Sequence, residues 1–242
     1  MNWDQSKYPP QDTDARVFLQ QFDSSHLNPP GVRYQDFPVV CQPDDRPVRI
    51  LAVGSNEEDT ANVLTDSGFE VSSYDLRLPV LSHMQLPRHH WRCVGDFVEA
   101  RHFPAEHFDH AYSLSAIEHF GFSCYEGSPT DLDYDVKAMD RMWGLLKWGG
   151  CCWITVPYGR VPTLFYPQWR IYDQNLLLSR IVRKFSVETM LFFKSNPDCP
   201  GQKEFPKDAD GIEWVPRNEA DAWKAPPTHP HQTVFLKMRK DR

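Results

Sequence analysis

The sequence predicts an α/β fold in which a mostly parallel sheet carries helices on both faces. Short apolar and β-branched runs bounded by Gly, Pro or Asp are typical of buried strands. One long segment repeats its apolar residues every three or four positions, as an amphipathic helix does. Strands and helices alternate along the chain with short connections, which favours parallel pairing. The predicted strands are Val48–Val53, Phe69–Tyr74, Phe108–Ser115 and Cys151–Val156, and the predicted helices are Thr60–Ser67 and Asp135–Leu146.

The rest of the chain is divided by turn residues and by changes of composition. Lys147–Gly150 is predicted to be a turn, and Phe185–Phe193 and Thr233–Met238 are predicted to be further strands. A Pro- and Asp-rich stretch, Asn196–Pro230, is predicted to be a long loop.

Two regions follow from the positions of the prolines. Residues 1–46 are rich in Pro and Asp and are predicted to be an N-terminal arm with one short helix. Residues 47–242 are predicted to form a single domain, with a core at 48–157 and a C-terminal part at 158–242.

Composition narrows the classes of partner. The net charge of −7 and the pI of about 5.8 argue against binding to a nucleic-acid backbone, which calls for a basic face. No apolar run approaches the roughly 20 residues of a membrane helix, and the N-terminus lacks the pattern of a secretory signal. The six cysteines form no C-x-x-C pair, which favours free thiols in a reducing compartment. We therefore expect a cytoplasmic protein with no membrane or nucleic-acid partner.

Three candidate site segments lie in the first half of the predicted core, and two of them follow predicted strands. Gly54 ends the first strand, where a glycine lets the backbone approach a ligand. Asp75 comes 21 residues later at the tip of the second strand, at the spacing of a ribose-binding acid. Asp96-Phe97 suits an adenine site, with the acid accepting from the amine and the ring stacking. The alternative for Asp75 is a strand-end aspartate in a turn, and the alternative for Asp96-Phe97 is a turn with a phenylalanine in the core.

A fourth segment carries a candidate base. Ser113-Leu114-Ser115 leads into Glu118 and His119 at the carboxyl end of a central strand. A histidine in that place can take a proton near neutral pH, and Glu118 is a candidate to orient it or to replace it. The alternative is a histidine that only caps or packs the next segment.

Taken together, residues 49–157 resemble the core of class I S-adenosylmethionine-dependent methyltransferases. The matching motifs are Leu51-Ala52-Val53-Gly54, Asp75, Asp96-Phe97, Ser113–His119, and Leu146–Gly150 followed by Thr155-Val156-Pro157. The resemblance implies a Rossmann-like sheet of seven strands whose last strand is antiparallel, with S-adenosylmethionine as cofactor. It also implies cofactor contacts at Gly54, Ser55, Asn56, Asp75, Asp96, Phe97 and Ser115.

The chain departs from that family's pattern in two places. Ala52 stands where the family often has an acid, and Ser55-Asn56-Glu57 replaces a second glycine. These departures motivate an alternative in which the fold serves as a catalytically inactive binding or scaffold protein. A nucleotide-dependent oxidoreductase is a weaker alternative, because it would favour that second glycine.

Residues after the predicted strand Cys151–Val156 are candidates for an acceptor pocket. Tyr158, Arg160, Arg170 and Tyr172 are predicted to bind the acceptor, with ordinary structural hydrogen bonds as the alternative. The segments that hold them resemble, more weakly, a branch associated with glycan or natural-product modification. The sequence thus predicts methyl transfer to a hydroxyl or amine of a small molecule, such as a sugar or natural product. It leaves open the acceptor atom and the oligomeric state, for which a homodimer is one option.

The acids of Asp131–Asp135 allow three interpretations. They suit a hard cation, the acidic motif of a nucleotide-sugar glycosyltransferase, or the N-terminal turn of the following helix, where negative charge is favourable. We favour the last, and because the histidines show no zinc-like pairing with cysteine, we predict no metal site.

Overall fold

The fold is described by a computed structural model. It describes residues 48–55, 61, 64–65, 69–77, 90–195, 212–215 and 232–242. The predicted N-terminal arm at 1–46 lies outside the described residues. Of the predicted helix Thr60–Ser67, the described residues 61, 64 and 65 are helical.

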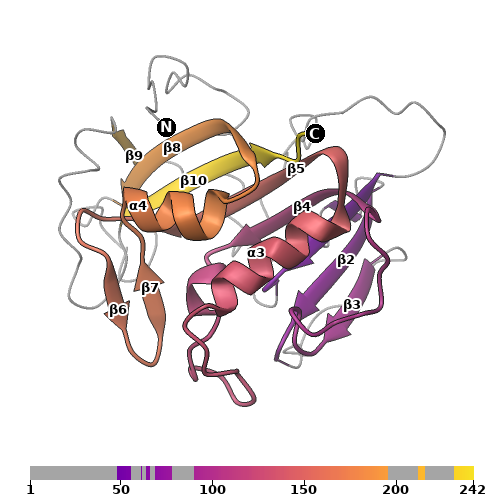
Figure 1. Ribbon diagram of the computed structural model, residues 1–242, viewed down its shortest axis with the longest axis horizontal. Helices are drawn as coiled ribbons and strands as arrows, with labels where there is room; N and C mark the ends of the chain where they lie inside the picture. Colours follow the sequence, from indigo (N-terminus) through magenta and orange to yellow (C-terminus); the bar gives the residue numbers. More distant parts are fainter. Residues whose placement is uncertain are drawn as a thin grey trace.

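One sheet organises the molecule (Figure 1). Its strand order is β3-β2-β1-β4-β5-β10-β8-β9. The first five of these run parallel, and β10 is antiparallel to both β5 and β8. The strands are β1 (Arg49–Val53), β2 (Glu70–Asp75), β3 (His90–Val94), β4 (Phe108–Leu114), β5 (Leu146–Pro157), β8 (Ser186–Ser195), β9 (Ile212–Val215) and β10 (Gln232–Arg239). The antiparallel last strand is confirmed, and β9 adds an eighth strand inside the stretch predicted to be a loop.

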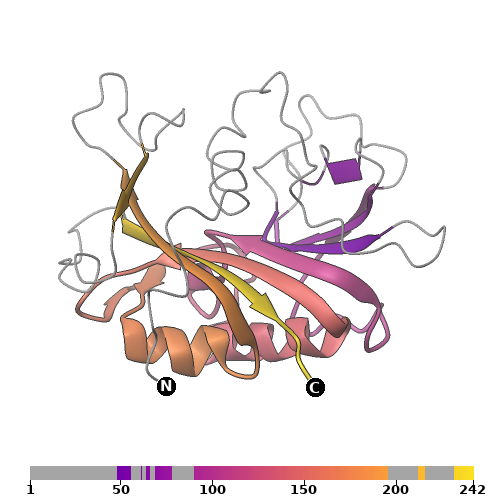
Figure 2. The ribbon, with the colours of Figure 1, turned by 90° about the horizontal axis from the view of Figure 1, so that it is seen from above.

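Helices cover the sheet and a small hairpin stands beside it. Figure 2 shows α3 and the continuous segment α4–η4 on one face of the sheet, and helical Leu64 packs in the apolar cluster on the other face. The hairpin β6–β7 forms a separate two-stranded sheet and contacts η3. These elements are η3 (Ile117–His119), α3 (Tyr134–Leu145), α4 (Gln174–Leu176), η4 (Leu177–Val182), β6 (Thr163–Phe165) and β7 (Trp169–Ile171).

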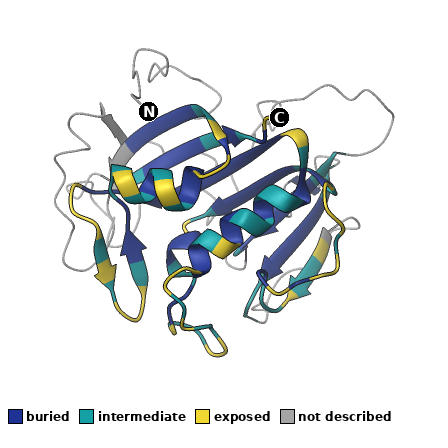
Figure 3. Cartoon of the chain, viewed as in Figure 1, coloured by how far each residue is buried: buried dark blue, intermediate teal, exposed yellow. Residues whose placement is uncertain are grey.

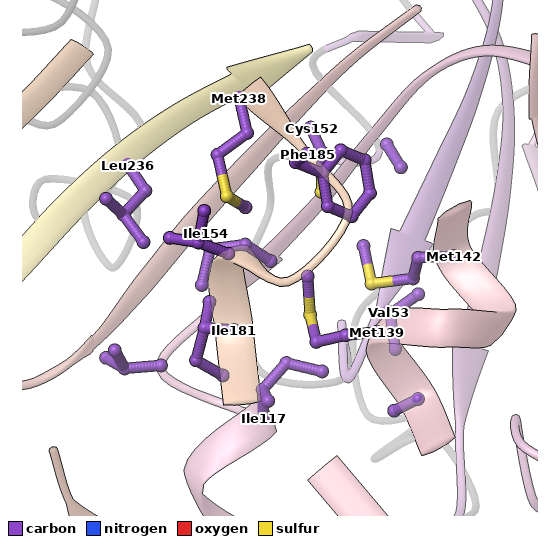
Figure 4. Close-up of a cluster of buried hydrophobic side chains, with 14 of the residues drawn as sticks. Val53, Ile117, Met139, Met142, Cys152, Ile154, Ile181, Phe185, Leu236 and Met238 are labelled. Carbon is purple, nitrogen blue, oxygen red and sulfur yellow. The ribbon is translucent and has the colours of Figure 1, made fainter. Parts of the chain in front are cut away.

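Alternation along β1 explains why both faces are covered. Leu51 and Val53 belong to the larger apolar cluster, which packs against α3 and η4, whereas Ile50 and Ala52 belong to a second cluster that includes Leu64. Figure 3 shows the central strands buried, and Figure 4 shows the larger cluster between sheet and helices. Because a strand alternates its side chains, an all-apolar strand needs cover on both sides.

The predicted turn Lys147–Gly150 lies within β5, and its correction has a physical reason. Phe108 pairs with Leu146, but His110 pairs with Cys151, so the residues between bulge out of register. A Cβ on Gly150 would lie 2.6 Å from the carbonyl oxygen of Asp109. The glycines therefore make the irregularity fit without ending the strand.

Candidate functional site

The predicted cofactor residues meet at the carboxyl edge of the parallel strands. The N–H of Gly54 donates to the carbonyl of Tyr74 at 2.7 Å, and the N–H of Gly95 donates to the carbonyl of Asp75 at 2.9 Å. These bonds join the ends of β1, β2 and β3, while β4 ends beside β1 at the same edge. Ligands of open α/β sheets bind at this edge.

The turn after β1 requires a glycine. Gly54 has a φ of +75°, and a Cβ there would lie 2.3 Å from the Cβ of Ala116. The next residue, Ser55, is buried, and its Oγ has no hydrogen-bond partner among the described residues. A buried hydroxyl without a partner costs free energy unless a ligand or water satisfies it. Asn56 lies outside the described residues.

Asp75 is bound by Arg77, a contact that the sequence pattern does not predict. Its Oδ1 accepts from the backbone N–H of Arg77 at 2.8 Å and from the Nε–H of the same residue at 3.0 Å. Its Oδ2 accepts from Arg77 Nη2 at 3.2 Å. The guanidinium also lies 4.5 Å from the ring centroid of Tyr125, in a cation–π contact. The signal for this pair was the arginine two residues after the predicted acid.

Asp96 and Phe97 have different surroundings. Asp96 Oδ1 accepts from the N–H of Val98 at 2.9 Å, and Oδ2 accepts from the hydroxyl of Tyr134. Burial and this carboxylate raise the pKa of the Tyr134 hydroxyl, which therefore stays a donor. Phe97 is buried, with its ring edge-on to Tyr74 at 5.6 Å. The structure thus favours the core alternative for Phe97 over stacking on a ligand.

Ser115 directly follows β4 and has an unusual backbone conformation. Its φ is +45°, which side chains other than glycine rarely adopt, and the residue is exposed. Its N–H is held by Thr155, donating to the hydroxyl oxygen at 2.9 Å and to the carbonyl at 3.1 Å. Such strained residues are found at binding sites, where surrounding contacts hold them.

His119 is oriented by the hairpin and not by Glu118. Its Nδ1 lies 2.8 Å from the carbonyl oxygen of Gln168, which can only accept, so Nδ1 carries the proton. In the neutral ring, Nε2 is then the basic nitrogen. The rings of Tyr125 and Trp169 lie 5.9 and 6.1 Å from the imidazole. The predicted orienting role of Glu118 is therefore corrected, because a carbonyl 49 residues away fills it.

Glu118 is directed into the interior. It is 3% exposed, and its Oε2 has no partner among the described residues. Burial raises the pKa of this carboxyl to about 8. At neutral pH the group is therefore mainly protonated.

Arg170 and Tyr172 lie in a buried charge cluster instead of an open pocket. Both donate to Asp135 Oδ2, which is fully buried at the start of α3. Arg180 donates to both oxygens of the same carboxylate. The structure favours the alternative of structural hydrogen bonds for these two predicted acceptor residues, and it supports the helix-start interpretation of the acidic segment.

The other two predicted acceptor residues differ from each other. Tyr158 is buried, bridges to Tyr172 and lies 4.8 Å from the ring of Phe192. Arg160 is exposed between β5 and β6. Within the described ranges, no three His, Cys, Asp or Glu side chains gather as metal ligands, and no helix is long and apolar enough to cross a membrane.

Comparison with known proteins agrees with this architecture. A family model described as a Caenorhabditis protein of unknown function, DUF268, matches residues 92–191. The search of curated proteins found no match. Among solved structures, the 1,6-didemethyltoxoflavin-N1-methyltransferase of Burkholderia thailandensis, with S-adenosylhomocysteine bound, is 14% identical with a TM-score of 0.54. That match covers 96% of this chain and 80% of the other. The chain has the Rossmann-like fold of class I methyltransferases.

Two further solved structures are similar. Phosphoethanolamine N-methyltransferase 2 of Haemonchus contortus, in complex with S-adenosyl-L-methionine, is 18% identical with a TM-score of 0.53. That match covers 97% of this chain and 59% of the other. The [4+2]-cyclase SpnF is 14% identical with a TM-score of 0.54, over 94% of this chain and 80% of the other. At these identities the likeness concerns the fold, so function has to be argued from the site.

Proposed function

We propose that this chain is an S-adenosylmethionine-dependent methyltransferase that acts on a hydroxyl or amine of a small molecule. The observation that carries the proposal is the joint placement of Gly54, Asp75 and His119 at the carboxyl edge of the sheet. The methyltransferases with this fold, whose structures hold S-adenosylmethionine or S-adenosylhomocysteine, support the choice of cofactor.

The described residues suit such a cofactor. Gly54 keeps the first turn free of a side chain, and the hydroxyl of Ser55 lacks a partner in the described part of the chain. Asp75 offers a carboxylate to the ribose diol, and Asp96 offers one beside the adenine position. Ser115 would line the end of β4. When bound, S-adenosylmethionine supplies a methyl group activated by its sulfonium.

His119 would handle the proton. With Nδ1–H held by the Gln168 carbonyl, Nε2 can accept the proton of an acceptor hydroxyl as oxygen gains the methyl group. An amine acceptor that is already neutral would need only positioning. The rings of Tyr125 and Trp169 flank the imidazole and would help to exclude water.

The finer identity of the acceptor is part of the proposal. We propose a small molecule such as a sugar or natural product, with exposed Arg160 at the acceptor side. We retain three predictions from the sequence. They are a cytoplasmic location, no nucleic-acid or membrane partner, and a homodimer as one option for the oligomeric state.

A second candidate function is a binding or scaffold module without catalysis. Its support is the salt bridge that engages the Asp75 carboxylate, together with the departures at Ala52 and Ser55. The likeness to SpnF, a [4+2]-cyclase, supports a third outcome in which the fold serves other chemistry. The glycosyltransferase alternative loses support, because Asp135 is engaged by two arginines.

Calorimetric titration with S-adenosylmethionine and S-adenosylhomocysteine tests the cofactor proposal. We expect micromolar binding that is lost in Asp75→Ala and kept in Asp140→Ala, a control acid that pairs with Arg183 on another part of the surface. If the folded wild-type protein binds neither ligand, the methyltransferase proposal is wrong and the scaffold function is favoured.

Acceptor screening with His119→Ala tests the proposed base. For a hydroxyl acceptor, we expect kcat to fall by about 10²- to 10⁴-fold while cofactor affinity is kept. An unchanged kcat would exclude His119 as the base.

A further inference from the structure

The carboxylate of Asp75 has little capacity left for a ligand. A carboxylate offers about four acceptor positions. Arg77 fills two on Oδ1, through its backbone N–H and its Nε–H, and one on Oδ2 through Nη2. The Asp75 side chain is only 9% exposed. With respect to the described residues, one acceptor position therefore remains, on Oδ2.

A ribose diol has two adjacent hydroxyl donors. To accept from both, Asp75 has to give up at least one of its bonds to the Arg77 guanidinium. The guanidinium already lies over the face of Tyr125, 4.5 Å from the ring centroid, so it can keep this contact when it leaves the carboxylate. The backbone N–H of Arg77 can stay on Oδ1 throughout.

We propose that Arg77 is a latch on Asp75: its guanidinium competes with a ribose diol for the carboxylate and withdraws against Tyr125 when the diol binds. This inference rests on the proposed function, because it assumes that a nucleoside ligand uses Asp75. It assigns Arg77 a positioning role, since it acts on the ligand through Asp75. The ring of Tyr125 lies 5.9 Å from that of His119, so Tyr125 contacts both the Arg77 guanidinium and the proposed base.

The latch is tested by calorimetric titration of two ligands that differ in one hydroxyl. The ligands are S-adenosylhomocysteine and its 2′-deoxyadenosyl analogue, which can use the remaining Oδ2 position without moving Arg77. The variants are Arg77→Met and Arg77→Gln, in case one folds poorly. Arg183→Met is the matched control, because Arg183 is 27% exposed and paired with Asp140, against 28% for Arg77.

We expect Arg77→Met to bind S-adenosylhomocysteine about three- to fivefold more tightly than wild type, because the competing ion pair is gone. The deoxy analogue should change by less than about twofold, and Arg183→Met should match wild type for both ligands. Raising the salt concentration should tighten S-adenosylhomocysteine binding in wild type but not in Arg77→Met, since salt weakens the pair.

Each other outcome has a definite meaning. If wild type binds S-adenosylhomocysteine and Arg77→Met and Arg77→Gln bind it equally or more weakly, the latch is wrong and the cofactor proposal stands. If Arg77→Met binds both ligands more tightly by the same factor, the cause is the loss of a nearby positive charge and the latch is again wrong. If no folded protein binds either ligand, both proposals fail. Binding by Arg77→Met alone would support both.

Discussion

Replacing Glu118 with Gln should make the protein more stable at neutral and alkaline pH. The carboxyl is buried without a partner on Oε2, and its pKa is raised from 4.5 to about 8. Between these values the folded state holds a proton that the unfolded state has lost, so stability falls as pH rises. The stability is full below pH 4.5 and reaches its lowest level above pH 8. At 1.36 kcal/mol per pH unit, the free energy of unfolding falls by about 5 kcal/mol over the whole range, and about 3 kcal/mol of this loss has occurred by pH 7.

Urea unfolding at several pH values between 4.5 and 9 measures this effect. The difference between Glu118→Gln and wild type isolates the one group, because all other titrations cancel. We expect the difference to grow from near zero at pH 4.5 to about 3 kcal/mol at pH 7. Glu99→Gln, whose carboxyl is 69% exposed, should differ little from wild type at any pH. A pH-independent difference for Glu118→Gln would refute the burial argument.

Three further predictions concern the framework of the site. Gly54→Ala should cost about 1–3 kcal/mol of unfolding free energy for its left-handed backbone, plus a clash that Ala116→Gly should relieve in the double variant. Burial lowers the pKa of His110 to about 4, and its Nδ1 accepts a hydrogen bond from the N–H of Cys151. The free energy of unfolding should therefore fall by about 3 kcal/mol as the pH drops from 6.5 to 4, because protons bind to the unfolded state first. Acid unfolding of His110→Gln should lack this pH dependence. Asp135→Ala should cost about 3–5 kcal/mol in denaturant unfolding, because it leaves buried Arg170 without its carboxylate; a cost below about 1 kcal/mol would contradict the importance of the cluster.

The parts that the sequence predicted are those governed by local pattern. The apolar run of β1, the 3.6-residue period of α3 and the acid ending β2 each carry their signal within a few neighbouring residues. The eighth strand β9 was missed because it is four residues long and lies in a Pro- and Asp-rich stretch. The hairpin was also missed because its strands are short, with three residues each in β6 and β7.

The site was predictable in its positions but not in its pairings. The placement of Gly54, Asp75 and His119 at one edge follows from the parallel direction of β1, β2 and β4, which the alternation of strands and helices already predicts. The partner of His119 is 49 residues away, so no local spacing indicates it. The pairing of Arg77 with Asp75 is local, but it can be recognised only when the side chain is seen to turn back.

The acceptor residues favoured from sequence have an indirect connection to the proposed chemistry. Arg170 lies in β7, two residues after Gln168, and its guanidinium is fixed to Asp135 of α3. Gln168, which bonds to His119, directly precedes β7, and Arg170, the middle residue of β7, is anchored in the buried charge cluster. Because a hairpin of three-residue strands has little stability of its own, its anchor at Arg170 holds the Gln168 carbonyl in place. Arg170 would then orient the base without touching the acceptor.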